Sequence, residues 1–245
     1  MARVTRGINR ALPAKPDSRQ AFLLLDCHPP QYFIDPTSKP HILLKFATIL
    51  AFFGMLRFNV LNKLKPAAIV LVSVTGPEVL LSRVPVVAAR KITEDYIGFY
   101  FRFRGKSTPI GDPPQAAYFP KIADLAREFS AFCPLSLLSR MHARGYFIHS
   151  GRKVFRPPLT AKVLCAYLVS LAGRARLSVE LALIKTHSLR IGGHTYFTAM
   201  GMNPDLTDYL GRRKVSRSSL RYFRASPSLT ISAVRRFFAS VPPST

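Results

Sequence analysis

Residues 41–57 read HILLKFATILAFFGMLR, which is the most apolar run of the chain. Ser38 and Pro40 stand before it as an N-cap and a first-turn residue, two signals that begin a helix. Residues 42–56 are too few to span a bilayer and include Lys45, so the run predicts a buried core helix instead. Its large side chains recur near the 3.6-residue helical period, at Ile42, Leu43, Phe46, Ile49, Leu50 and Phe53.

After this helix the pattern predicts more helix and then strands. Helical character continues over 54–65, and Pro66 ends it because proline cannot continue a helix. Residues 67–109 carry the β-branched and aromatic runs IVLVSV, VPVVAA and YIGFYFRF, the last with phenylalanines alternating with tyrosine and arginines. Such runs predict two to four short strands that end in a turn over 105–109.

The second half of the chain returns to helical spacing. We expect helical segments over 119–142, 160–172, 187–201 and 204–211, with a short strand at 146–148 and a basic loop at 151–158. The predicted fold class is therefore α+β and mainly helical, with a small antiparallel sheet near the middle of the first half.

Charge is the strongest feature of the composition. The chain carries 36 lysines and arginines against 12 acidic residues, a formal net charge of +24. With 48% hydrophobic and 11% aromatic residues it is expected to fold rather than to behave as a disordered basic tail. So many positive charges repel one another in a compact protein. A polyanionic partner, either nucleic acid or an anionic membrane surface, offsets that repulsion. After Asp208 the sequence contains eight basic residues and no acidic one.

Several common kinds of site are excluded by the sequence. Gly105-Lys106-Ser107 lacks the glycine that a phosphate-binding loop needs five positions earlier, and Pro109 interrupts the helix that should follow. The histidines and cysteines show no zinc-ligand spacing, so we predict no metal site. The three cysteines are widely separated, which favours a reducing compartment: Cys27, Cys133 and Cys165.

A set of basic and polar residues follows a distinctive order. Phe-Phe-Gly-Met-Leu-Arg ends at Arg57, Lys106 lies in the turn after the strands, and His187 and Arg190 share a helix face at i and i+3. Leu-Gly-Arg-Arg, residues 210–213, follows about twenty residues later, and Tyr222 comes eleven residues after the glycine. Taken singly, each feature is more commonly explained by structure alone, as a histidine beside a surface arginine or a tyrosine packed on a helix. The order and spacing of the whole set favour a shared site.

This order resembles the catalytic domain of the tyrosine recombinases, the phage-integrase family, over roughly residues 40–225. Two of its motifs are most similar to those in the recombinases of eukaryotic Crypton and DIRS mobile elements. They are Arg-Gly-Lys-Ser-Thr-Pro and His-Ser-Leu-Arg-Ile-Gly-Gly-His-Thr. The resemblance implies a catalytic domain over 21–225 and a C-terminal tail over 226–245, of which 229–241 would be a short helix packed on a neighbouring protomer. Residues 1–20 would be a basic linker, the remnant of an upstream DNA-clamping domain.

The same resemblance implies DNA breakage and rejoining through a 3′-phosphotyrosyl intermediate, which needs neither ATP, metal nor any other cofactor. Tyr222 would attack phosphorus as the nucleophile. Arg57 and Arg190 would hold the non-bridging oxygens with forked, charge-assisted hydrogen bonds. Lys106 would protonate the leaving 5′ oxygen, and His187 would donate to the phosphate or move a proton.

Further basic residues are expected to contact the DNA backbone without reading its sequence. They flank the predicted turn and the proposed nucleophile: Arg102, Arg104, Arg212, Lys214, Arg217, Arg221 and Arg224. The predicted partners are double-stranded DNA and other copies of the chain, as a dimer or tetramer on DNA, with no membrane. The nucleus is the expected location, from the type of element that the chain resembles and from its basic runs.

Two positions depart from the family pattern. Val60 stands where an acidic residue usually follows the first arginine, and Arg213 stands where the family has histidine or tryptophan. An arginine there would still donate to the scissile phosphate, so Arg213 is retained among the candidate catalytic residues. Three alternatives remain: a catalytically decayed DNA-binding remnant, an enzyme like the type IB topoisomerases, and a basic protein at an anionic membrane surface. The serines and tyrosine mixed into 212–224 disfavour the last.

Overall fold

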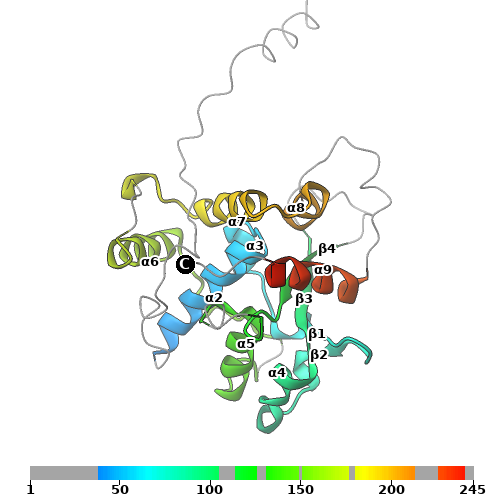
Figure 1. The fold of residues 1–245 in the computed structure, drawn as a ribbon. Coiled ribbons are helices and arrows are strands. Elements are labelled where there is room, and N and C mark those ends of the chain that lie inside the picture. The colour runs from blue at the N-terminus through cyan, green and yellow to red at the C-terminus, as the bar shows by residue number, and fades with distance from the viewer. Residues whose placement is uncertain are drawn as a thin grey trace, which may run out of the picture.

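The apolar run at the start of the chain's core forms α2 (Lys39–Phe53), as predicted, in a computed structural model. The structure describes residues 38–104, 114–125, 131–148, 151–176, 180–212 and 226–240. Of the 15 residues of α2, 11 are buried, because α5 (Pro134–Ala143) and α7 (Ser188–Ala199) pack along it (Figure 1). A helix this apolar on every side requires cover on every side.

The chain leaves α2 through a sharp turn and does not continue as a helix. Met55 has a φ of 44°, in the left-handed region, and the Gly54 N–H closes the helix end on the Leu50 carbonyl at 3.0 Å. Within the predicted helical stretch 54–65 only the four-residue α3 (Phe58–Leu61) forms, so that prediction is largely wrong. The 3₁₀ turn η3 (Pro66–Ala68) then leads into the sheet.

Four short antiparallel strands make one sheet, in the order β2-β1-β3-β4. They are β1 (Ile69–Val72), β2 (Val79–Leu80), β3 (Gly98–Phe103) and β4 (Gln115–Pro120). The first three lie inside the predicted 67–109. β4 lies beyond that range, and its last two residues overlap the helix predicted over 119–142, which is wrong at that end. The run VPVVAA is not a strand, because Pro85 is followed by the 3₁₀ turn η5 (Val86–Ala88), which comes after a similar turn, η4 (Leu81–Arg83).

Phenylalanine rings hold the two central strands together. Phe99 pairs with Phe119 across β3 and β4, and their rings stack with centroids 4.8 Å apart. Phe101 stacks on the same Phe119 ring at 5.5 Å. All three are buried, as the alternation along β3 predicts. Tyr100, on the other face, is also buried, and its hydroxyl donates to Glu78 Oε2 at 2.7 Å.

The last helix, α9 (Pro227–Ser240), lies across β3 and β4 of its own chain (Figure 1). It buries Ile231, Val234 and Phe238, and an Ile231 methyl group fills the space above Gly98, where an added Cβ would lie 2.9 Å from it. The predicted C-terminal helix is therefore confirmed. Within this single chain α9 packs on its own sheet and completes the core, so its expected packing on a neighbouring protomer stays a prediction.

The remaining helices follow the sequence closely in the last third of the chain. The predictions over 160–172, 187–201 and 204–211 are confirmed by α6 (Ala161–Arg174), α7 and α8 (Pro204–Gly211), with the 3₁₀ turn η7 (Leu181–Leu183) before α7. Earlier in the chain, α4 (Lys91–Asp95) is short, and α5 fills only the end of the predicted 119–142. Residues 146–148 form a turn after Gly145, whose φ is 74°, and not a strand.

The coarse prediction of a mainly helical α+β protein with a small antiparallel sheet is confirmed. Among the residues that the structure describes, none of the helices is both long and apolar enough to cross a membrane.

Candidate functional site

Three segments far apart in sequence meet at the C-terminal end of α2. They are the turn that follows α2, the first turn of α7, and the C-terminal end of α8 (Figure 1). The last carbonyls of a helix have no partner within the helix and carry the negative end of its dipole. Here the carbonyls of Gly54 and Met55 take up that role and attract two arginine side chains.

A glycine allows α7 to come this close. A Cβ added to Gly193 would lie 2.2 Å from the Phe52 carbonyl oxygen, a distance that no real side chain tolerates. The aromatic rings around it complete the contact: the centroid of Phe52 lies 6.0 Å from that of Tyr196 and 6.2 Å from that of Phe197. The Gly-Gly in the run that follows Arg190 thus brings the arginine-bearing turn of α7 against the end of α2.

Arg190, in the first turn of α7, links all three segments. Its Nη1 donates to the Met55 carbonyl in a short hydrogen bond, and its Nη2 donates to the Gly211 carbonyl at 2.6 Å. The side chain is half-buried between them. A contact between α7 and α8 supports the same geometry, since His194 Nε2 lies 3.7 Å from Asp208 Oδ1.

Arg212 links the third segment to the first. It ends α8 in the left-handed conformation, with a φ of 51°, so that its side chain turns back toward α2. Its Nη2 donates to the Met55 carbonyl at 3.0 Å and, in a shorter bond, to the Gly54 carbonyl. Its Nη1 donates to the Ala116 carbonyl of β4 at 3.3 Å, and the guanidinium carbon lies 5.3 Å from the centre of the Phe103 ring.

Positive charge accumulates at this point. Because Arg190 and Arg212 donate to the same Met55 oxygen, their guanidinium groups lie side by side. Burial, then the charge of Arg190 and then that of Arg57, lower the pKa of Arg212 to about 9, so it stays protonated at pH 7. Two unit charges about 5 Å apart repel by ~3 kcal/mol at an effective dielectric constant near 20. We call Arg57, Arg190 and Arg212 the arginine cluster; the arrangement suits binding of an oxyanion.

The other described catalytic candidates are Arg57, the exposed member of the cluster, and His187. Arg57 caps the start of α3 two residues after Met55, and its side chain is exposed. His187 is the residue before α7 and lies one helical turn from Arg190. The structure thus brings the two predicted phosphate-binding arginines, Arg57 and Arg190, to one end of α2.

Several candidate residues lie outside the described part of the chain. They include the expected nucleophile and general acid, with most of the expected DNA contacts: Lys106, Arg213, Lys214, Arg217, Arg221, Tyr222 and Arg224. Two other expected DNA contacts are described, Arg102 near the end of β3 and Arg104 directly after it. Both are exposed, and Arg102 lies over the Tyr100 ring, 5.6 Å from its centre.

Sequence reasoning missed the central place of Arg212. It was expected on the DNA-facing surface, yet its guanidinium is enclosed by carbonyls from the turn after α2 and from β4. A Gly-Arg pair directly after a helical pattern marks a helix end, but nothing in the sequence shows where the side chain will point. Val60, the departure from the family pattern, is buried in α3 with 7% of its surface exposed. An acidic side chain would be costly at such a position.

The described residues also bear on metal binding and on other cavities. The residues that the structure describes contain no group of three or more histidine, cysteine or acidic residues arranged to hold a metal ion. A cavity of about 300 Å³ lies apart from the arginine cluster, between α2 and α6. None of its lining residues belongs to the predicted site: His41, Leu44, Val163, Tyr167, Ser170 and Arg174.

Comparison with known proteins adds no family. No protein-family model, no curated protein and no solved structure matches the chain.

Proposed function

We propose that the protein breaks and rejoins double-stranded DNA as the tyrosine recombinase of a mobile element, acting in the nucleus as a dimer or tetramer. The observation that supports this most is the arginine cluster. Arg57 and Arg190, which the sequence order nominates as phosphate-binding residues, come from segments 133 positions apart and lie at one end of α2 with a third arginine. Three guanidinium groups at one end of α2 match an anionic phosphodiester better than any neutral substrate.

The proposed reaction develops negative charge on the phosphate, where the arginine cluster can stabilise it. The Tyr222 oxygen attacks phosphorus and forms a P–O bond as its proton passes to His187, while the bond to the 5′ oxygen breaks and that oxygen takes a proton from Lys106. The pentacoordinate transition state carries more negative charge on its non-bridging oxygens than the ground state does. Guanidinium donors held in advance therefore favour the transition state. In the reverse step, a 5′ hydroxyl attacks the phosphotyrosine and rejoins the strand. The energy of the phosphodiester bond is thus conserved in the intermediate.

A nicked suicide substrate tests this function. After cleavage, the short fragment that carries the free 5′ hydroxyl diffuses away and cannot rejoin. The covalent protein–DNA complex therefore accumulates, and it survives denaturing gels. The wild-type chain should form this complex, and Tyr222→Phe should abolish it. Tyr146→Phe is the matched control, because Tyr146 lies in the turn after α5, far in sequence from the cluster, and should leave trapping unchanged. Absence of trapping by wild type, or equal trapping by Tyr222→Phe, would refute the catalytic proposal.

A second candidate is DNA binding without strand transfer. Two observations favour it: main-chain carbonyls already accept hydrogen bonds from Arg190 and Arg212, and Val60 supplies no acidic group near Arg57. Guanidinium groups that hold a turn together have fewer donors left for a phosphate. This candidate predicts salt-dependent binding to duplex DNA that Tyr222→Phe leaves unchanged, with no covalent product.

A further inference from the structure

Two surface loops, neither of which contains a residue of the arginine cluster, are joined by a set of hydrogen bonds. The Val154 N–H donates to the Leu64 carbonyl at 2.9 Å. The Asn62 side chain bonds Leu159 twice: its Nδ2 donates to the Leu159 carbonyl at 2.8 Å, and its Oδ1 accepts from the Leu159 N–H at 2.9 Å. The segment after α3 and the basic loop over 151–158 therefore form one fixed surface.

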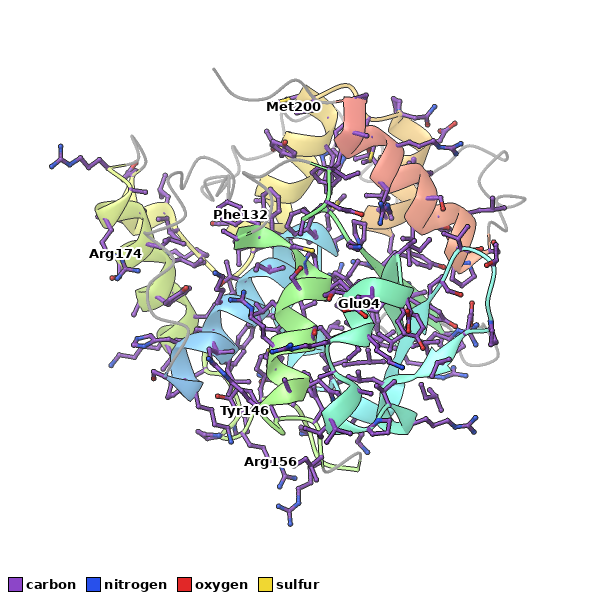
Figure 2. The ribbon with its side chains drawn as sticks, turned by 60° about the horizontal axis from the view of Figure 1, so that its bottom comes forward. Glu94, Phe132, Tyr146, Arg156, Arg174 and Met200 are labelled. Carbon is purple, nitrogen blue, oxygen red and sulfur yellow. The ribbon has the colours of Figure 1, made fainter. Side chains whose placement is uncertain are left out.

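The hydrogen bonding between the two loops leaves their basic side chains on the surface. Leu64, Val154 and Phe155 point into the core, with 3%, 7% and 1% of their surfaces exposed. The residues next to them in sequence are exposed, and Figure 2 shows Arg156 at the edge of the molecule. We call these exposed cations the basic patch: Lys63, Lys65, Arg152, Lys153 and Arg156.

No acidic residue in the neighbouring sequence balances the patch. Residues 36–77 and 129–179, which contain both loops, include no aspartate or glutamate. Among the residues that the structure describes, none of the five cations takes part in an ion pair. Five like charges on hydrogen-bonded loops repel one another, and an extended polyanion lowers that repulsion at all five together.

The patch is also continuous in sequence with the candidate site. Arg57 and Lys63 are separated by α3 and one further residue, and four helical residues rise only about 6 Å. A duplex bound at the arginine cluster is much longer than this distance, since successive phosphates on one strand rise 3.4 Å along its axis.

We propose that the basic patch binds the backbone of the DNA that flanks the reaction site. This inference rests on the proposed function for the choice of DNA as the polyanion. The patch meets phosphates, so it adds affinity and salt dependence and reads no sequence. It positions the duplex and takes no part in breaking or joining the strand.

The test compares two triple variants that remove the same charge. Lys65→Gln, Arg152→Gln and Lys153→Gln together neutralise most of the patch. Arg90→Gln, Lys91→Gln and Arg236→Gln together neutralise three exposed cations on α4 and α9. Binding of each full-length protein to a 40-base-pair duplex is measured by fluorescence anisotropy at several salt concentrations. Denaturant unfolding confirms that the variants fold, because exposed substitutions of this kind change stability little.

The patch variant should reduce the slope of log affinity against log salt by about 2 to 3, at about 0.9 for each phosphate that is no longer neutralised. It should also bind about tenfold or more weakly near physiological salt, whereas the control variant keeps the wild-type slope. An unchanged slope in the patch variant, or an equal loss in both variants, would overturn the proposal. So would a patch variant that loses binding to phosphatidylserine vesicles but keeps the wild-type DNA slope.

The two proposals can fail separately. A reduced slope in the patch variant without covalent trapping by wild type supports the patch and refutes recombinase chemistry. Covalent trapping together with an unchanged slope supports the chemistry and refutes the patch.

Discussion

The Arg212 guanidinium donates a 3.0 Å hydrogen bond to the Met55 carbonyl, 157 residues earlier in the chain. The same carbonyl accepts a hydrogen bond from Arg190. One oxygen at the end of α2 thus fixes two cations from α7 and α8, and the left-handed turn at Met55 is what presents that oxygen. The candidate site and the end of the core helix are therefore one structural unit.

This relationship predicts a stability cost for removing Arg212. Arg212→Ala leaves the carbonyls of Gly54, Met55 and Ala116 without this donor, while it relieves repulsion with Arg190. We expect a net loss of about 1–3 kcal/mol in the free energy of unfolding, measured in urea. Arg236→Ala, an exposed change on α9, should cost less than about 0.5 kcal/mol. Equal values for the two variants would show that the hydrogen bonds contribute nothing net.

Arg57 should separate function from stability. Its side chain is exposed, so Arg57→Ala should change the free energy of unfolding by no more than about 0.5 kcal/mol. If it holds the scissile phosphate, the same variant should slow covalent trapping by about 10²-fold or more, as for loss of one preorganised donor. Rates of trapping on the nicked substrate measure this effect. A normal rate in a folded Arg57→Ala protein would remove this residue from the proposed machinery.

The contact between α2 and α7 can be tested with two glycines in helices. Gly193→Ala places a Cβ 2.2 Å from the Phe52 carbonyl oxygen, and main chain cannot yield cheaply, so we expect a loss of about 3 kcal/mol or more. Gly173→Ala, near the end of α6, meets nothing within 4 Å. That change should instead stabilise by about 0.5–1 kcal/mol through helix propensity. Thermal unfolding of the two variants measures both effects. A Gly193→Ala protein as stable as wild type would contradict the close approach of α7 to α2.

Lys45 gives the protein a pH-dependent stability. Burial, and after it the charge of Arg140, lowers the pKa of Lys45 to about 8 from its ordinary 10.5. Between these values the unfolded chain binds more protons than the folded one, so the free energy of unfolding should rise with pH from about 8 to 10.5. The penalty of burying the charge is fully present below pH 8.

Lys45→Met should accordingly stabilise the protein by about 2 kcal/mol at pH 7, and the difference from wild type should shrink as the pH approaches 10.5. Urea unfolding at a series of pH values measures both effects. Lys162→Met, an exposed change on α6, is the control and should leave the pH profile unaltered. Parallel profiles for wild type and Lys45→Met would contradict the linkage.

The elements that could be predicted from sequence are those whose signals are local. The 3.6-residue pattern beginning at Ile42 and the Asn-Pro that begins α8 both lie within a few residues of the structure they specify. Asn203 shows the mechanism directly, because its side chain accepts hydrogen bonds from the N–H groups of Asp205 and Leu206.

The errors arose where distant residues determine the conformation. β4 has only six residues and is held by its ladder with β3, so the local sequence pattern did not predict a strand there. The turn at Met55 is held by Arg190 and Arg212, which come more than 130 residues later. The order of the basic and polar residues along the chain predicted that Arg57 and Arg190 come together. It did not predict the enclosure of Arg212, which depends on distant carbonyls.

The position of α9 yields a prediction about assembly. Phe238 and Ile231 are buried against the protein's own sheet and against rings of α2 and α7, with the Phe53 and Phe238 centroids 5.7 Å apart. Phe238→Ala should therefore cost about 3–4 kcal/mol, and Leu229→Ala, an exposed change on the same helix, almost nothing. Because this packing lies within one chain, the melting temperature of the DNA-free protein should not change over a hundredfold range of protein concentration. A melting temperature that rises with concentration, and that Phe238→Ala makes independent of concentration, would mean that α9 binds a second copy in solution.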